Sequence, residues 1–157
     1  MKIKVSIIAA LIVGVVIGAV GLREMIPGMM IQERQSSLSF DATVERIQTN
    51  AQENGWMIPK VHNLRKSLMA HGYDDVGGMA VIEMCKPDYS SIILSDDSQK
   101  SVSVMMPCAV AVYEKQDGTT WISTMRSDKM GALLGGNVKT AMSGVYSEEP
   151  KLFDFVQ

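Results

Sequence analysis

Cysteine is scarce in this sequence, with Cys85 and Cys108 the only two among 157 residues. Two cysteines are too few to be the framework of a small disulfide-built fold. They are not spaced as C-x-x-C or C-x-x-C-H, which argues against thioredoxin-like redox chemistry and against covalent c-type haem. Three interpretations of the pair stay open: two buried apolar side chains, one disulfide, or a metal or redox site.

Motifs for catalysis and nucleotide binding are lacking too. The sequence has no G-x-S-x-G elbow, no P-loop and no dinucleotide fingerprint, which favours a non-enzymatic role while leaving the enzyme question open. Runs of basic residues are also missing. Beyond residue 22 the chain has 13 Lys and Arg against 17 Asp and Glu, a net charge of −4, so we expect no nucleic-acid partner.

One long apolar run is present, Val5–Leu22, with 18 residues and no charge. As a helix it would span about 27 Å, close to the hydrocarbon core of a bilayer. We therefore expect residues 1–22 to be a transmembrane anchor or an uncleaved signal. A cleaved signal peptide is the alternative, although its apolar region usually has only about 7–15 residues.

The charges around this run predict its orientation. Lys2 and Lys4 precede it, whereas Arg23 after it is followed at once by Glu24. The positive-inside rule then leaves the N-terminus in the cytoplasm and the rest of the chain outside. We expect a single-pass protein of the bacterial inner (cytoplasmic) membrane with its C-terminal domain in the periplasm.

Three further segments follow the anchor. Residues 23–30 contain Pro27 and Gly28 and have the composition of a linker. Residues 31–146 have enough apolar positions for one α+β domain. Pro150 is expected to separate a short C-terminal tail, residues 147–157, that docks on the domain.

Helical periodicity is clearest in two places. Over Ser39–Asn54 apolar residues recur on one face, Ser39 is placed as a cap and Asn54-Gly55 as a stop. Over Ser127–Val145 a second apolar stripe predicts a closing helix, which Gly135-Gly136 weakens and could split. The pattern also predicts helical turns over 65–72 and a short helix opened by Pro87.

Strand patterns fill much of the remainder. They cover Ile31–Arg34, Trp56–Leu64, Met79–Cys85, Val102–Glu114 and Thr119–Met125. Continuous apolarity predicts burial of Met79–Cys85 on both faces, and Pro59 favours an edge or a bulge for Trp56–Leu64. Asp117-Gly118 predicts a two-residue hairpin turn that pairs Glu114 with Trp121. Hairpin-linked strands with helices on one face define an α+β fold with a mainly antiparallel sheet.

Three stretches resemble one bacterial and archaeal family. These are S-L-S-F-D-A-T-V-E-R-I around Ser39, I-E-M-C-K-P around Cys85 and M-P-C-A-V-A-V-Y-E around Cys108. They are similar to the uncharacterised family numbered 302 among the domains of unknown function, over about residues 28–146. The resemblance implies a single β-α-β(4)-α layer like that of the TATA-binding protein, often found as a homodimer, and it implies no activity.

Sulfur-bearing residues are the main candidates for chemistry. Methionine is abundant, with 13 in the chain, and Met106 lies two residues before Cys108. Thiolate and thioether groups suit Cu(I), and a thioether suits an axial position on haem. Cys85, Cys108 and Met106 are therefore candidate ligands for copper, non-covalent haem or a sulfur species, while methionines as ordinary core residues are the alternative.

His62, His71 and Glu83 are weaker candidates. The two histidines have no H-x-x-x-H or H-E-x-x-H spacing, so surface positions are their default, with metal ligation the alternative. Glu83 is the one acid in an apolar strand, so it either finds a partner, with Arg65, Lys66 and Arg126 as candidates, or marks an exposed sheet position. As partners of the whole protein we expect the membrane and either a second copy or another membrane protein.

Overall fold

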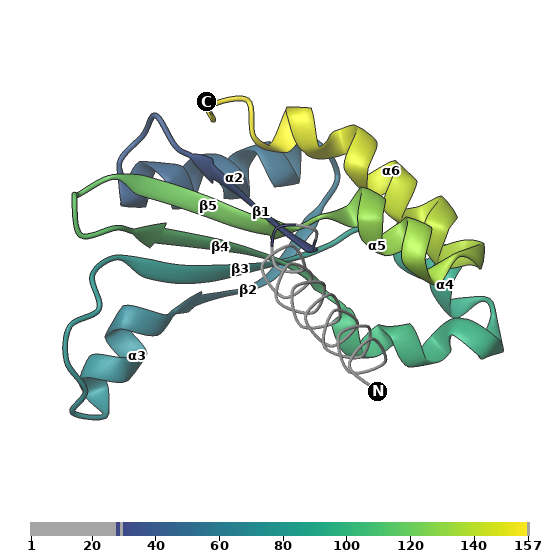
Figure 1. The fold of residues 1–157 in the computed structure, drawn as a ribbon, viewed down its shortest axis with the longest axis horizontal. Helices are drawn as coiled ribbons and strands as arrows, with labels where there is room; N and C mark the ends of the chain where they lie inside the picture. The colour runs from purple at the N-terminus through teal and green to yellow at the C-terminus, as the bar shows by residue number, and fades with distance from the viewer. Residues whose placement is uncertain (1–27, 29, 157) are drawn as a thin grey trace, which may run out of the picture.

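The computed structural model describes residue 28 and residues 30–156 (Figure 1). A five-stranded antiparallel sheet forms its centre, in the order β1-β5-β4-β3-β2. The strands are β1 Ile31–Gln35, β2 Met57–Asn63, β3 Met79–Cys85, β4 Cys108–Glu114 and β5 Thr120–Met125. The sheet confirms the expected α+β class.

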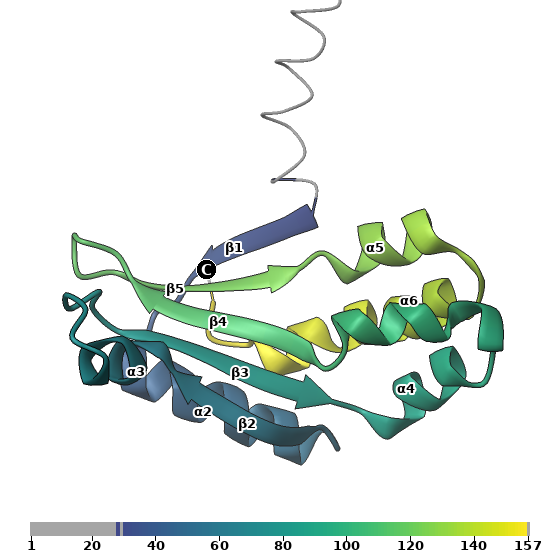
Figure 2. The same cartoon turned by 90° about the horizontal axis from the view of Figure 1, so that it is seen from below.

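Within residues 30–156, six helical segments accompany the sheet. They are α2 Phe40–Glu53, α3 Leu64–Ala70, α4 Pro87–Leu94, the 3-10 helix η1 Asp97–Met105, α5 Ser127–Leu134 and α6 Gly136–Leu152. Helices α4 and α5 and the start of α6 gather beyond one end of the strands, while α3 lies at the other end (Figure 2). In the described part of the chain no helix is long and apolar enough to span a bilayer. The anchor expected over Val5–Leu22 lies outside the described residues.

Helix α2 forms where the sequence predicts it. Ser39 takes the N-cap position, but its side chain makes no capping hydrogen bond, and its carbonyl instead accepts the N–H of Thr43 at 2.8 Å. Gly55 follows the helix with φ +77°, a left-handed conformation that glycine adopts without a steric penalty. Ile47 and Ala51 on its inner face are fully buried, as the periodicity requires.

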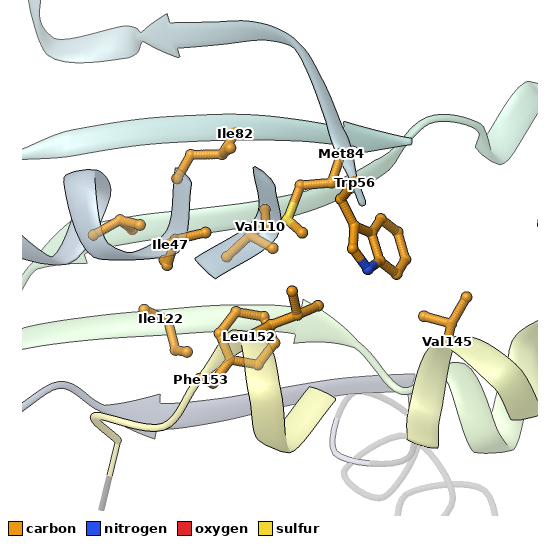
Figure 3. Close-up of a cluster of buried hydrophobic side chains, with 11 residues drawn as sticks. Ile47, Trp56, Ile82, Met84, Val110, Ile122, Val145, Leu152 and Phe153 are labelled. Atoms are coloured by element: carbon orange, nitrogen blue, oxygen red, sulfur yellow. The ribbon is translucent and has the colours of Figure 1, made fainter. Parts of the chain in front are cut away.

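The main core lies between α2, the C-terminal half of α6 and one face of the sheet (Figure 3). Its buried members are Ile47, Ala51, Trp56, Ile82, Met84, Val110, Val112, Ile122, Val145, Leu152 and Phe153. In β3 burial alternates, with Ala80, Ile82 and Met84 inward and the residues between them half-buried. The expectation that β3 is buried on both faces is therefore wrong, because the helices that form this core cover one face only.

Two strand boundaries differ from the sequence pattern. Residues Val102–Met105 belong to η1, so β4 begins only at Cys108. Pro107 explains the limit, because proline lacks the N–H that a ladder position must donate. At the other edge Pro59 has the expected effect, since the register of β2 shifts between Met57 and Lys60.

The β4–β5 hairpin has a longer turn than predicted. Glu114 pairs with Thr120 and Tyr113 with Trp121, so the expected pairing of Glu114 with Trp121 is wrong. The N–H of Lys115 donates to Thr119 O, and the N–H of Gly118 donates to Lys115 O, both at 2.9 Å. This is a three-residue loop closed by a left-handed glycine, φ +78°. The extra residue exchanges the two faces of β5, which buries Ile122 rather than Trp121.

The closing helix is split into α5 and α6. Gly135 and Gly136 both have positive φ, +68° and +52°, and the chain turns between the two helices there. A Cβ on Gly131 would lie only 2.9 Å from Met142 Cβ, so this glycine permits close contact of α5 with α6 rather than with the sheet. Pro150 does not end the helix, because α6 continues to Leu152 and includes the start of the expected tail.

Candidate functional site

The two cysteines lie at neighbouring strand ends. Cys85 is the last residue of β3, and Cys108 is the first of β4 and pairs with Met84. Antiparallel pairing places the end of one strand beside the start of the next, so a connection of more than twenty residues brings the two together. Both cysteines are free and half-buried.

A small cavity joins these residues. Its volume is about 20 Å³, and Cys85, Met106 and Cys108 all contribute to its wall. The Sγ of Cys85 also lies 3.4 Å from Ser90 Oγ of α4. A single water needs about 10–15 Å³ of such volume, so the cavity suits one ion or one small group.

A second, larger pocket of about 70 Å³ shares part of this wall. It lies between the sheet, η1, α5 and α6, and its lining is almost wholly apolar. Its sulfur-bearing residues are Met84, Met105, Met106, Cys108, Met125, Met130 and Met142. Of these seven residues the sequence predicted only that Met106 and Cys108 would lie together. The other methionines come from five different elements, and only tertiary packing unites them.

Burial controls the chemistry of the Cys108 thiol. It raises the pKa of Cys108, and the nearby charge that Cys85 can carry raises it further. Both effects favour the neutral thiol at neutral pH. Cys108 is therefore not an activated nucleophile, and a bound cation would have to displace its proton.

A buried carboxylate, Glu149, lines the larger pocket and was not anticipated. Only 5% of it is exposed. Its Oε2 accepts hydrogen bonds from Arg34 and Gln32, both at 2.8 Å, and its Oε1 accepts one from Ser127 at 3.0 Å. The sequence placed Glu149 in the expected tail, where two adjacent acids before Pro150 predict nothing specific. The structure instead includes this residue in α6, which points its carboxylate at the pocket.

Glu148, the residue before Glu149 in α6, forms a separate hydrogen-bonded cluster. Its carboxylate accepts hydrogen bonds from Trp56 Nε1 at 2.7 Å, Lys86 Nζ at 2.7 Å and Tyr89 OH at 2.6 Å. Burial alone would raise the pKa of Glu148, but these hydrogen bonds outweigh it and the pKa lies below its ordinary value. Burial and the same carboxylate raise the pKa of Tyr89 to about 12. The cluster fixes Lys86 at the wall of the small cavity.

The histidines do not join the sulfur-lined cavities. His62 pairs with Glu83 on the half-exposed face of the sheet, Nε2 to Oε1 2.7 Å. The partner of Glu83 is thus His62 and none of the three basic residues proposed from the sequence. His71 caps α3 through Nδ1 and the carbonyl of Ser67, at 2.8 Å. The residues described contain no group of three or more His, Cys, Asp or Glu that could hold a metal ion.

The volumes of the two cavities and the donor atoms around them favour Cu(I) over haem. Cys85, Cys108 and Met106 offer two thiols and one thioether around a space of ion size, a donor set that suits Cu(I). Pockets for drug-sized ligands enclose about 300–1,000 Å³, and a porphyrin needs space of that order. A pocket of about 70 Å³ is too small, so the residues present do not fit haem.

The fold and the site define a class: a small α+β domain with a five-stranded antiparallel sheet and a sulfur-lined cavity at the end of its central strands. The family described as "Domain of unknown function DUF302" matches residues 32–148, and the chain belongs to that family.

Comparison with known proteins supports the fold. The crystal structure of an uncharacterised conserved DUF302 protein from Bacillus stearothermophilus is similar over 81% of this chain and 98% of that one. The TM-score is 0.69 and the sequence identity 20%, so the likeness concerns the fold alone. No curated protein matches the chain.

Proposed function

We propose that this protein is a membrane-anchored binding domain without enzymatic activity, which holds a soft ligand, Cu(I), in the small sulfur-lined cavity. The observation that carries the proposal is the shared cavity itself. Three donors from two separate segments, Cys85 and the pair Met106 and Cys108, surround about 20 Å³. Cu(I) prefers thiolate and thioether ligands over the nitrogen and oxygen donors that other metals select.

The surroundings of the cavity also support a binding role. Met84, Met106 and Met142 line both cavities, so thioethers flank the site on several sides. The larger pocket beside the site has an almost wholly apolar lining, which disfavours water next to a soft ion. Lys86 lies at the wall of the small cavity and is held by Glu148.

Copper titration of the full chain in detergent tests the proposal. We expect one Cu(I) per chain to be taken from a chromogenic competitor chelator under anaerobic, reducing conditions. Cys85→Ser and Cys108→Ser should each lower the affinity at least about tenfold, because each removes one ligand. Met106→Leu should lower it less, since a thioether is the weakest of the three donors.

Met69→Leu is the matched control for Met106→Leu. Met69 is half-exposed on α3 and lines neither cavity. Met69→Leu should therefore leave the Cu(I) affinity unchanged. Equal affinity of the parent chain and the double cysteine variant would refute the copper site.

The membrane address of the domain is part of the proposal. It rests on the apolar run Val5–Leu22 and on Lys2 and Lys4 before it. We propose a single-pass protein of the bacterial inner membrane with its C-terminal domain in the periplasm. There the domain would serve as an accessory subunit that binds its ligand beside the bilayer.

Assembly through the free face of the sheet is a second candidate role. Val81, Ala109, Ala111 and Ser123 on that face are half-buried or exposed and short. Short side chains let two sheets approach closely, which favours a homodimer. Light scattering of the detergent-solubilised chain should then give a dimer mass, and Ala109→Arg should give a monomer. A monomeric parent chain would exclude this role.

A further inference from the structure

Helix α5 ends in an unusual run of exposed apolar residues. Ala132, Leu133 and Leu134 are all exposed, and Leu133 is 72% accessible. A run of consecutive exposed apolar side chains in a soluble helix is unfavourable unless another surface covers it. Within α5 the residues that face α6, Met130 and Gly131, are already buried.

A second exposed apolar pair lies at the sheet edge. Ile31 of β1 and Met125 of β5 are directly paired and are 53% and 40% exposed. Helix α5 begins at Ser127, two residues after Met125, so this pair lies next to the start of the helix. The start of β1 and helix α5 lie on the same side of the molecule (Figure 2). We call Ile31, Met125, Leu133 and Leu134 the apolar rim.

The apolar rim lies where the described chain begins. The N–H of Arg126 donates to the carbonyl of Met30 at 2.8 Å, which fixes residue 30 beside the start of α5. Only the eight residues 23–30 separate the apolar run ending at Leu22 from β1. Fully extended, eight residues span about 27 Å at most. An anchor in the bilayer therefore holds the rim close to the membrane surface.

Charges beside the rim suit a lipid surface. Arg126 and Lys129 lie on the same helix start and have 33% and 50% exposed side chains, with Asp128 between them. The local net charge is thus +1. A basic residue near an anionic leaflet is attracted to it, and exposed leucines add their favourable transfer from water into the interface.

We propose that the apolar rim rests on the bilayer, with Leu133 and Leu134 inserted among the lipid headgroups. The inference rests on the anchor that forms part of the proposed function, and it adds an orientation of the domain. Met125 belongs to the rim and also lines the larger pocket. In this orientation that wall of the pocket faces the lipid.

Tryptophan quenching by brominated lipids tests the orientation. The full chain is reconstituted into vesicles of anionic and zwitterionic lipid, with bromine on the upper part of the acyl chains. Leu133→Trp adds a reporter on the rim, with Leu134→Trp as a second reporter at the adjacent position. We expect the added emission to be quenched about twofold or more over that of the native tryptophans, since interfacial helices sit ~5–10 Å into the headgroup region.

Met69→Trp provides the control position. Met69 is 50% exposed on α3, at the other end of the strands from α5 (Figure 1). Its added emission should not be quenched. If the chain floats with the vesicles but Leu133→Trp and Leu134→Trp are quenched no more than Met69→Trp, the anchor stands and the orientation is refuted. If the chain does not float at all, the anchor fails and the orientation fails with it.

Discussion

Glu148 and Lys86 form an ion pair whose two charged groups are both largely shielded from water. Either charge would be unfavourable in this position without the other. The side chain of Glu148 is 16% exposed, as is that of Lys86, and Lys86 also lies over the rings of Trp56 and Tyr89 at 5.9 and 5.6 Å. Each partner satisfies the other, so the pair is stable only when complete. The cluster links α6, α4 and the chain before β2.

Removing that charge should destabilise the protein. Glu148→Gln leaves Lys86 without its counter-ion, and we expect a loss of about 2 kcal/mol in the free energy of unfolding by urea. The exposed Glu53→Gln on α2 is the matched control and should change it by less than about 0.5 kcal/mol. Equal effects of both variants would mean that the cluster contributes nothing.

The pH dependence of this pair has a definite sign. The folded-state pKa of Glu148 lies below the ordinary value of 4.5, so the unfolded chain binds the proton more tightly. The contribution is therefore complete above pH 4.5 and is lost as the pH falls through the lower folded-state pKa. In Glu148→Gln this part of the acid-induced loss of stability should vanish.

The copper binding that we propose should also depend on pH, through the thiol of Cys108. Its pKa is raised by burial, so the thiol must release a proton when it becomes a ligand. From about pH 6 to about pH 8 the apparent Cu(I) affinity should increase, by up to about tenfold per pH unit for each thiol that loses a proton. The competition titration repeated across this range measures the slope. A flat profile would show that Cys108 is not a ligand.

At the scale of elements, glycines with positive φ decide where strands and helices end. Gly118 closes the β4–β5 loop, and Gly135 and Gly136 separate α5 from α6. The break lets α5 fold back so that Gly131 meets Met142 of α6. The larger pocket exists because of this return, since Met130 of α5 and Met142 of α6 form part of its wall.

The loop glycine gives a prediction for one element. Gly118→Ala keeps open space around the new Cβ but forces a side chain into φ +78°. It should cost about 1 kcal/mol of stability in chemical denaturation. Gly118→Asn should cost less, because asparagine tolerates the left-handed region better than alanine. If Gly118→Asn lost more stability than Gly118→Ala, backbone strain would not be the cause.

At the scale of the whole molecule, the domain gathers its sulfur-lined cavities and its apolar rim at one end. Helices α4 and α5 and the start of α6 lie at this end, and the described chain begins beside α5 (Figure 2). An anchor preceding β1 would therefore place the ligand site, rather than the α3 end, nearest the bilayer.

Topology of the full chain is the prediction at this scale. Alkaline phosphatase fused after Gln157 should be active, because this enzyme matures only after export, and a fluorescent protein that folds only in the cytoplasm should be dark. Lys2→Glu combined with Lys4→Glu should weaken the orientation signal and reduce the phosphatase activity. The mass of the purified chain shows whether the anchor is kept. A chain that begins near residue 22 would indicate a cleaved signal peptide.

Local chemistry was enough for many elements. Helix α2, strand β3, the helix opened by Pro87 and the irregularity at Pro59 all follow from periodicity, proline and glycine, which act within a few residues. The motifs around Ser39, Cys85 and Cys108 were enough to indicate the family, which the match over residues 32–148 confirms. The α+β class follows from the same local patterns.

The rest was decided by contacts between distant residues. Alternation predicted a strand over Val102–Glu114, but residues Val102–Met105 pack as part of η1 near α6, and the turn after Glu114 is one residue longer than the sequence predicted. A single such residue exchanges the faces of a strand, so local pattern cannot fix which side chains are buried. The sequence by itself named Cys85, Cys108 and Met106. Only the tertiary structure placed Glu149 and methionines from five other positions around Met106 and Cys108, because α6 had to continue through Pro150 and pack on the sheet before those side chains could meet.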